Sequence, residues 1–354
     1  MNSVRELAAL GDVDPRVAAA AQQTALGRTV RSTTLWVAVA LLAIILLFGA
    51  LSDGVFLRAD NISDMAVNSV IAVILAVGAT FILGAGLLDL SIGSSLLLCS
   101  IVSAKVTTAL AGSAEEVAAG VYPNLALGIA GGVAAGIACG ALLGAVNGLI
   151  VTRLKLNSFI VTLATMGIFN GIALIVTNGV NVPNVPQQLQ TDFAGSKLAG
   201  IPLPVFLAAI VAAAMWFVLT KTRFGMRTLA IGSSEEAARR ANVPVDRHIV
   251  SLFVLMGVLA GIAGIVDLAR FGTTNLEGHQ TDALAAFAAT VIGGTSLFGG
   301  RASVGGAVLG ALIPVVLATG LVILDVVSFY QLVVVGVILI LAVWLDQLRR
   351  SRFN

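Results

Sequence analysis

Charged residues are scarce in this chain. Of its 354 residues, 11% are Asp, Glu, Lys or Arg, whereas 58% are hydrophobic, and the mean hydropathy is +1.03. A soluble domain carries about 25% charged residues. A soluble fold with so few of them would expose a large apolar patch and aggregate. The composition therefore excludes a soluble globular protein and indicates a protein that crosses a membrane several times.

Cysteine and histidine are rarer still. Cys99 and Cys139 both lie in apolar runs, which is typical of small core residues, and their spacing predicts neither a disulfide nor a metal site. His248 and His279 lie in separate segments and are interpreted as bystanders. The net charge of +2 is not gathered into a basic face, so the sequence does not indicate nucleic-acid binding.

The motifs of nucleotide hydrolysis and nucleophilic catalysis are also missing. No G-x-x-x-x-G-K-[ST] loop occurs, and the nearest segment, residues 294–301, lacks the lysine. No Cys/His or Ser/His/Asp constellation is recognisable. We therefore expect no catalytic residue, no metal and no cofactor on this chain, and no enzymatic activity of its own.

Long apolar runs, by contrast, are abundant. A helix needs about 20 apolar residues to cross the hydrocarbon core of a bilayer. Ten runs meet or approach this length: 35–51, 65–86, 91–110, 125–151, 159–177, 203–219, 249–268, 283–297, 304–323 and 331–344. The run 283–297 is the weakest of them. The sequence predicts an all-α polytopic transmembrane helix bundle of about ten spans.

The distribution of positive charge predicts the orientation of this bundle. With ten spans and a cytoplasmic N-terminus, 16 of the 20 Lys and Arg residues lie on the inner side, and only Arg58, Lys105, Lys197 and Arg270 do not. This asymmetry follows the positive-inside rule and places both termini in the cytoplasm. The expected organisation is a cytoplasmic tail over 1–33, a transmembrane domain over 34–347 with a cytoplasmic loop at 221–247, and a second tail over 348–354.

The fourth run carries glycine at every fourth position from Gly128 to Gly148. Small residues at this spacing let helices approach closely in lipid. Because four residues advance a helix by about 400°, the glycine stripe drifts around the helix. We expect this helix to touch several neighbours and to lie inside the bundle.

The loop 221–247 contains a helix-start signal. Ser233 and Glu236 have the spacing of a capping box, Glu235 and Arg239 have the signs that the helix dipole favours at the two ends, and Pro244 ends the segment. The pattern predicts a short helix of about two turns over 233–242, preceded by a glycine hinge at Gly232. A solvated connector is the alternative interpretation; a rigid knob would suit docking to another subunit.

Uncharged polar residues and one carboxylate interrupt the apolar runs. Asp89 is the only charge between residues 65 and 104. With Ser91 it either caps the third helix or faces a substrate path through a broken helix. Other polar residues that can bond a hydroxylated solute, or equally a neighbouring helix, are Asn68, Asn147, Asn157, Thr162, Asn170 and Thr290. The apparent shortage of intramembrane carboxylates argues against a proton- or sodium-driven carrier.

Four stretches together resemble a known family, the permease subunits of ATP-binding-cassette (ABC) importers for monosaccharides of the ribose, xylose, arabinose and galactose group. They are Gly86-Leu-Leu-Asp89-Leu-Ser-Ile-Gly93-Ser94, Asn147-Gly148 with Phe159-Ile-Val-Thr162-Leu163, Thr222-Arg-Phe-Gly225 through Gly232 to Glu236-Ala-Ala238-Arg239, and Asp282-Ala283 through Ile292-Gly-Gly-Thr-Ser-Leu297 to Gly299-Gly-Arg301. The sequence departs from the family pattern at Ser158, where proline is usual, and at Ser234, where asparagine is usual.

The resemblance implies a sugar permease in a bacterial cell membrane. It implies cytoplasmic ABC ATPase subunits that bind ATP and Mg²⁺, an extracytoplasmic sugar-binding protein, and a second permease copy or a sister permease. The residues expected to couple to the ATPase are Gly225, Gly232, Ser233, Glu235, Glu236, Ala237, Ala238 and Arg239. The residues expected along the substrate path are Asn68, Asp89, Ser91, Asn157, Thr162 and Asn170. A permease for branched-chain amino acids or nucleosides, and an ion-coupled secondary carrier, are the alternatives.

Overall fold

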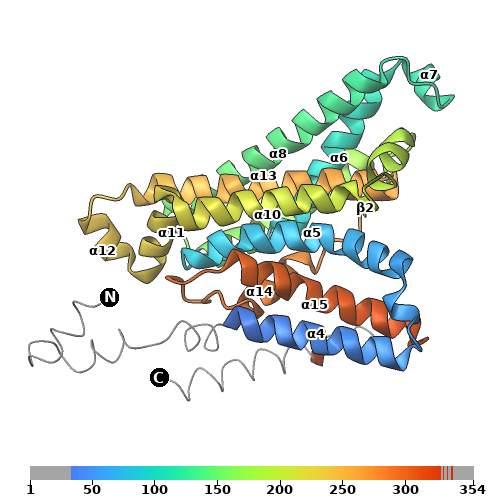
Figure 1. The fold of residues 1–354 in the computed structure, drawn as a ribbon. Helices are drawn as coiled ribbons and strands as arrows, with labels where there is room; N and C mark the ends of the chain where they lie inside the picture. The colour runs from blue at the N-terminus through green and yellow to red at the C-terminus, as the bar shows by residue number, and fades with distance from the viewer. Residues whose placement is uncertain (1–32, 328–329, 331–332, 334–335, 338–354) are drawn as a thin grey trace, which may run out of the picture.

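The computed structural model describes residues 33–327 together with residues 330, 333, 336 and 337. The expected tails, 1–33 and 348–354, lie outside this part except for Thr33, and the expected tenth span, 331–344, lies mostly outside it. The described chain is built almost entirely of helices (Figure 1). Its eight long apolar helices are α4 (Thr33–Leu51), α5 (Ala59–Gly84), α6 (Ile92–Ala111), α8 (Leu125–Leu154), α9 (Ser158–Thr177), α10 (Leu203–Lys221), α13 (Val245–Phe271) and α15 (Val304–Ile323).

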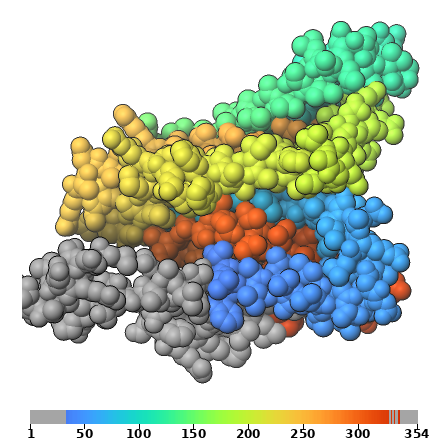
Figure 2. Space-filling view, viewed as in Figure 1, coloured from blue at the N-terminus to red at the C-terminus, as the bar shows by residue number. Residues whose placement is uncertain are grey.

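Shorter elements gather at the two ends of these long helices. At one end lie α11 (Arg223–Ser233) and α12 (Glu235–Arg240); we call it the joint end. At the opposite end lie α7 (Ala114–Ala118) and the hairpin β1 (Lys197–Leu198) and β2 (Ile201–Pro202), in which Leu198 pairs with Ile201. Figure 1 shows the two groups far apart, and Figure 2 shows the region of α7 projecting beyond the neighbouring helices. The remaining elements are a 3₁₀ turn (Val55–Leu57), a π-helical turn η2 (Gln190–Ala194) and α14 (Asp282–Ile292).

The core is centred on α5, α6 and α13, which are largely buried, whereas α4, α9 and α10 are largely exposed. Helix α5 packs against α13 and also against α14 and α15. Helix α13 packs against α5, α6 and α8 and contacts α11 and α12 at the joint end. Together with α5, which also contacts α11, it connects the joint end to the middle of the bundle.

The glycine stripe on α8 is the surface through which this helix packs. Toward α7, a Cβ at Gly132 would meet Thr107 of α6; further along, a Cβ at Gly140 would meet the carbonyl oxygen of Gly257 on α13. The prediction that the glycine stripe contacts different neighbouring helices along its length is therefore confirmed. The prediction that α8 lies inside the bundle is wrong, because Leu127, Leu142 and Leu149 on its other face are exposed.

The expected eighth span, 283–297, is a much shorter helix. Helix α14 has 11 residues, which at 1.5 Å per residue gives about 16 Å, roughly half the thickness of a hydrocarbon core. Gly293 ends it and packs against Gly306 of α15, so that residues 293–303 form a loop instead of a last turn. This loop returns to the joint end, where the Gly300 amide donates to the Gly84 carbonyl at 3.0 Å.

The loop between α10 and α13 contains more helix than the sequence predicts. Thr222 caps α11 by accepting from the amides of Phe224 and Gly225. A capped helix does follow, but its start is one residue later than predicted: Ser234 is the N-cap of α12, and its hydroxyl accepts from the Ala237 amide at 3.2 Å. Ser233 instead ends α11, where its hydroxyl donates to the Leu229 carbonyl. The capping-box interpretation is therefore wrong, because the adjacent serine has the extended backbone that an N-cap requires.

Gly232 is not a hinge between loop and helix. It lies within α11, and a Cβ there would meet the Gly84 carbonyl oxygen and the Gly300 amide. The glycine permits three backbone segments to pack at the joint end: the end of α5, the end of α11 and the loop after α14.

The contact between α8 and α13 predicts a pair of substitutions. In Gly140→Ala the added methyl meets the Gly257 carbonyl, and overpacking of this kind costs about 1–3 kcal/mol. Gly171→Ala on α9 is the matched control, because nothing lies within 4 Å of its Cβ position. We expect a lower thermal unfolding midpoint for Gly140→Ala in detergent and an unchanged one for Gly171→Ala. Equal midpoints would show that the α8–α13 contact is not tight.

Candidate functional site

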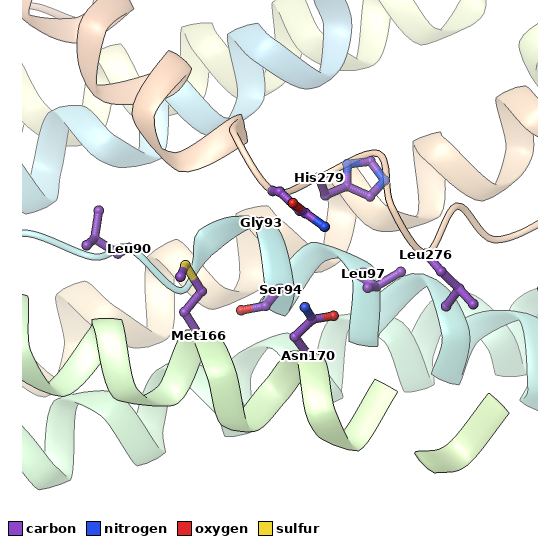
Figure 3. A pocket seen from close by; sticks show the side chains of 9 residues that line it. Leu90, Gly93, Ser94, Leu97, Met166, Asn170, Leu276 and His279 are labelled. Atoms are coloured by element: carbon purple, nitrogen blue, oxygen red, sulfur yellow. The ribbon is translucent and has the colours of Figure 1, made fainter. Parts of the chain in front are cut away.

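A cavity of about 300 Å³ lies between α6, α9 and the segment 272–281, which connects α13 to α14. Its lining residues are Leu90, Gly93, Ser94, Leu97, Met166, Asn170, Leu276, His279 and Gln280. Figure 3 shows Met166 and Asn170 extending from α9 toward Gly93 and Ser94 of α6, with His279 on the connecting segment. The lining is mainly apolar with a few polar groups and includes no carboxylate, lysine or arginine, which suits a neutral polar ligand.

A second cavity of about 560 Å³ adjoins the first. The two share Asn170, Leu276 and Gln280. The second extends along α9 to Gly179, away from the joint end, and adds the polar residues Asn181, Asn275 and Glu277. Together the two cavities, with polar groups set among apolar ones, extend from the middle of the bundle toward the end that carries α7.

The backbone between α5 and α6 leaves the helical conformation inside the bundle. Helix α5 ends at Gly84; Gly86, two residues further on, has φ +74°, and the Leu87 amide reaches back to the Ile82 carbonyl at 3.0 Å. The next amides have no helical partners. Instead Leu88 donates to the hydroxyl of Ser158 at 3.1 Å and Leu90 to that of Thr162 at 3.0 Å. The two hydroxyls stand one turn apart on α9 and satisfy polar groups that hydrocarbon cannot.

Asp89 is held in a buried chain of hydrogen bonds. Its Oδ1 accepts from the Ser91 amide at 2.9 Å and from the Ser91 hydroxyl at 2.6 Å. The Asn147 side chain on α8 donates to the same hydroxyl oxygen at 2.7 Å. Asp89, Ser91 and Asn147 are at most 3% exposed, and none of them lines a cavity described above. Their geometry closes the break between α5 and α6 and fixes where α6 begins.

A second buried polar cluster borders the first cavity. His279 Nδ1 lies 2.8 Å from Asp282 Oδ2 in the first turn of α14, and His279 Nε2 lies 3.2 Å from Asp267 Oδ2 on α13. Asp267 is 1% exposed and its other oxygen has no hydrogen-bond partner. The His279 carbonyl oxygen also touches Gly93, where a Cβ would collide with it. The imidazole thus connects two helices and brings the connecting segment against α6.

The residues predicted along a substrate path are distributed over several places. Of these predicted residues, only Asn170 lines the two adjoining cavities. Thr162 supports the break, as described above, and Asn157 caps α9 by accepting from the Phe159 amide at 2.9 Å. Asn68 accepts from Arg270 and lines a separate cavity of about 440 Å³.

Sequence reasoning missed Asp267 and the connections of His279. Asp267 lies inside the apolar run 249–268, so the inference that Asp89 is nearly the only intramembrane carboxylate is wrong. His279 is not a bystander in the fold, because it binds both Asp267 and Asp282. The spacing of His279 and Asp282, three residues apart at a helix start, is a sequence pattern that indicates their contact. The contact with Asp267 depends on tertiary structure. Among the described residues, no group of three His, Cys, Asp or Glu side chains is arranged to hold a metal ion.

Comparison with known proteins agrees with this architecture. Residues 61–343 match the family described as branched-chain amino acid transport system / permease component. The chain is 37% identical over 305 residues to the D-allose transport system permease protein AlsC of Escherichia coli, covering 86% of this chain and 89% of that protein. It is 39% identical over 293 residues to the ribose import permease protein RbsC of Bacillus subtilis, covering 82% and 86%. No solved structure matches the chain.

The chain is a multi-pass membrane protein that belongs to this permease family. More particularly, its relatives are permease subunits of ABC transport systems, and this chain is a subunit of that kind.

The chain of bonds at Asp89 predicts a stability effect. Ser91→Ala leaves the Asn147 amide group without its acceptor and removes one donor from Asp89, and an unsatisfied buried polar group costs about 1–3 kcal/mol. Ser94→Ala is the control, because the Ser94 hydroxyl donates only to the Ser91 carbonyl within its own turn. We expect the thermal unfolding midpoint to fall clearly for Ser91→Ala and little for Ser94→Ala. A larger loss for Ser94→Ala would contradict the assignment.

Proposed function

We propose that this chain is the transmembrane permease of an ABC importer that moves a neutral monosaccharide, a pentose or a hexose, into the cell. Its partners are cytoplasmic ATPase subunits that bind ATP and Mg²⁺, an extracytoplasmic sugar-binding protein, and a second copy of the permease or a sister permease. The assembly lies in the inner membrane of a bacterium. The joint end faces the cytoplasm, as the positive-inside rule predicts for the basic residues of α11 and α12.

The chemistry of the two cavities carries the sugar assignment. A monosaccharide offers hydroxyl groups of both hydrogen-bonding roles and no charge. The first cavity presents Ser94, Asn170 and Gln280 among apolar side chains, and such groups donate and accept hydrogen bonds without the desolvation cost of an ion pair. The relatives point the same way, since they include transport proteins for allose, ribose and xylose.

The joint end supports the coupling role. Arg239 of α12 bonds Glu235 in its own helix at 2.8 Å and also Asp246 in the first turn of α13. The hydrogen bonds that Arg239 donates to Asp246 and to Glu235 raise the pKa of its guanidinium above the ordinary value. Ala238 is buried and faces the neighbouring helices. A push on α12 thereby reaches α13, which runs through the core. The residues proposed to form this joint are Gly225, Gly232, Ser233, Glu235, Glu236, Ala237, Ala238 and Arg239.

Two other functions make different demands. A branched-chain amino acid is a zwitterion at neutral pH, and the first cavity has no pair of opposite charges free to receive one. A secondary carrier needs an intramembrane group that exchanges a coupling ion. Asp267 is a carboxylate in such a position, so this alternative is decided by the energy source for uptake.

Reconstitution with partners tests the proposal. The permease and its ATPase are placed in liposomes with the binding protein, and uptake of radiolabelled D-ribose, D-xylose, D-allose and leucine is measured. We expect uptake of at least one sugar that requires ATP on the cytoplasmic side and is unaffected by a protonophore. Uptake of leucine alone would replace the substrate assignment, and uptake that a protonophore abolishes without ATP would replace the mechanism.

The joint gives a matched pair of variants. Arg239→Ala removes the bond between α12 and α13, whereas Arg240→Ala removes only a bond to Glu236 within α12. We expect Arg239→Ala to lower uptake per ATP hydrolysed several-fold, because α13 no longer follows α12, and Arg240→Ala to leave the ratio near that of the parent protein. The measurement is sugar uptake and phosphate release in the same liposomes. Equal ratios in the two variants would remove Arg239 from the coupling path.

A further inference from the structure

The segment 272–281 forms one side of both cavities, yet side chains supply most of its attachment. Within residues 33–327, the backbone–backbone hydrogen bonds that join its stretch 273–281 to a helix go only to the start of α14, where the carbonyls of His279 and Thr281 accept from the amides of Asp282 and Ala285. Toward the α7 end, Thr274 accepts from the Val182 amide at 2.9 Å and the Leu276 amide reaches Asn181 at 3.4 Å. Toward the core, the attachment is His279. A stretch bound in this way can be displaced if only the first turn of α14 moves or opens with it, while the long helices stay intact.

The hydrogen bonds at His279 are of a stronger type than those at Thr274 and Leu276, because their partners are carboxylates. The His279 imidazole lies between two carboxylates, one on α13 and one at the start of α14. The His279 side chain is 8% exposed and that of Asp267 1%, and hydrogen bonds to charged partners in such surroundings exceed neutral ones in strength. The backbone contact between His279 and Gly93 places segment 272–281 directly against the first turn of α6.

Helix α13 connects this attachment to the joint end. Asp246, bound by Arg239, and Asp267, bound by His279, lie 21 residues apart on one continuous helix, which corresponds to about 32 Å. A displacement of the joint end of α13 therefore reaches Asp267 through a rigid element, and from Asp267 it reaches the wall of the cavities.

We propose that His279 is a positioning residue of the transport cycle: bound by Asp267 and Asp282, it holds segment 272–281 as the movable wall of the sugar route, and α13 carries the motion of the joint to it. This inference rests on the proposed function for the identity of the solute. The role of His279 in holding segment 272–281 in place does not depend on it. It predicts that release of His279 opens the route without ATP.

The experiment uses the complete importer in liposomes with Cys99→Ala and Cys139→Ala as background. Met166→Cys is the reporter, because Met166 lines the first cavity but not the second. Its labelling by a membrane-impermeant thiol reagent, added from the binding-protein side without ATP, measures passage along the wall. In His279→Ala we expect labelling on the order of 10-fold faster, since loss of a buried charge-assisted bond shifts a two-state equilibrium by about that factor. Passive equilibration of D-xylose is expected to rise as well.

His248→Ala is the matched control. His248 is likewise a buried histidine with a hydrogen bond, 2.9 Å from Thr228, but at the joint end of α13. We expect it to leave the labelling of Met166→Cys unchanged in the absence of ATP. Equal acceleration in both histidine variants would indicate general loosening and overturn the proposal, as would parental labelling in His279→Ala.

Two further variants keep the proposal open to refutation. If His279→Ala does not accumulate, His279→Gln, which reaches one carboxylate at most, must label faster than the parent. Asp267→Asn retains an acceptor for the imidazole, so it must label more slowly than Asp267→Leu; the reverse order overturns the role of the bond. If the parent complex transports no sugar, the proposed function fails, whereas the labelling rates still decide the position of the wall.

Discussion

Backbone polar groups in a membrane protein must find partners within the protein wherever the chain is not helical. Within residues 33–327, the chain leaves the helix inside its bundle at residues 85–91 and at residues 272–281. At the first, hydroxyl groups on α9 accept from amides that have lost their helical acceptors. At the second, threonine, asparagine and histidine side chains hold the segment. Both irregular segments also line the first cavity, the first through Leu90 and the second through Leu276, His279 and Gln280. The hydrogen bonds that satisfy their backbone groups therefore also hold part of the cavity wall in place.

Close packing through glycine complements this arrangement. The stripe on α8 brings its backbone against α13, and a group of glycines at the joint end brings α5, α11 and the loop after α14 together. Such contacts leave little room for sliding of one element past another, because any larger side chain would collide with backbone. Helix α13 is thereby held along its length by α8 and α5, and it contacts α12 at the joint end. Rigidity along α13 and loose attachment of segment 272–281 are the two properties that a driven pathway requires.

The polar residues inside the bundle separate into two roles. Asp89, Ser91 and Asn147 bond one another and are closed off from the cavities, so they maintain the break between α5 and α6. Asn170, Ser94 and Gln280 keep polar atoms at the cavity surface. Residue type does not distinguish these roles, since each set contains an amide and a hydroxyl. What distinguishes them is whether a neighbouring helix uses the hydrogen-bonding capacity or leaves it for a ligand.

The sequence by itself determined the membrane class, the eight long helices of the described chain and the family, because hydropathy, length and local motifs are properties of consecutive residues. It also predicted a capped helix after α10 and the drift of glycine contacts along α8. Only the tertiary structure decided that α14 is too short to span, that Asn170 faces a cavity while Asn157 caps a helix, and that His279 meets Asp267. The physical reason is that these outcomes depend on contacts between residues distant in the chain. The apolar pattern of a helix predicts that the helix packs, but it does not identify the helix against which it packs.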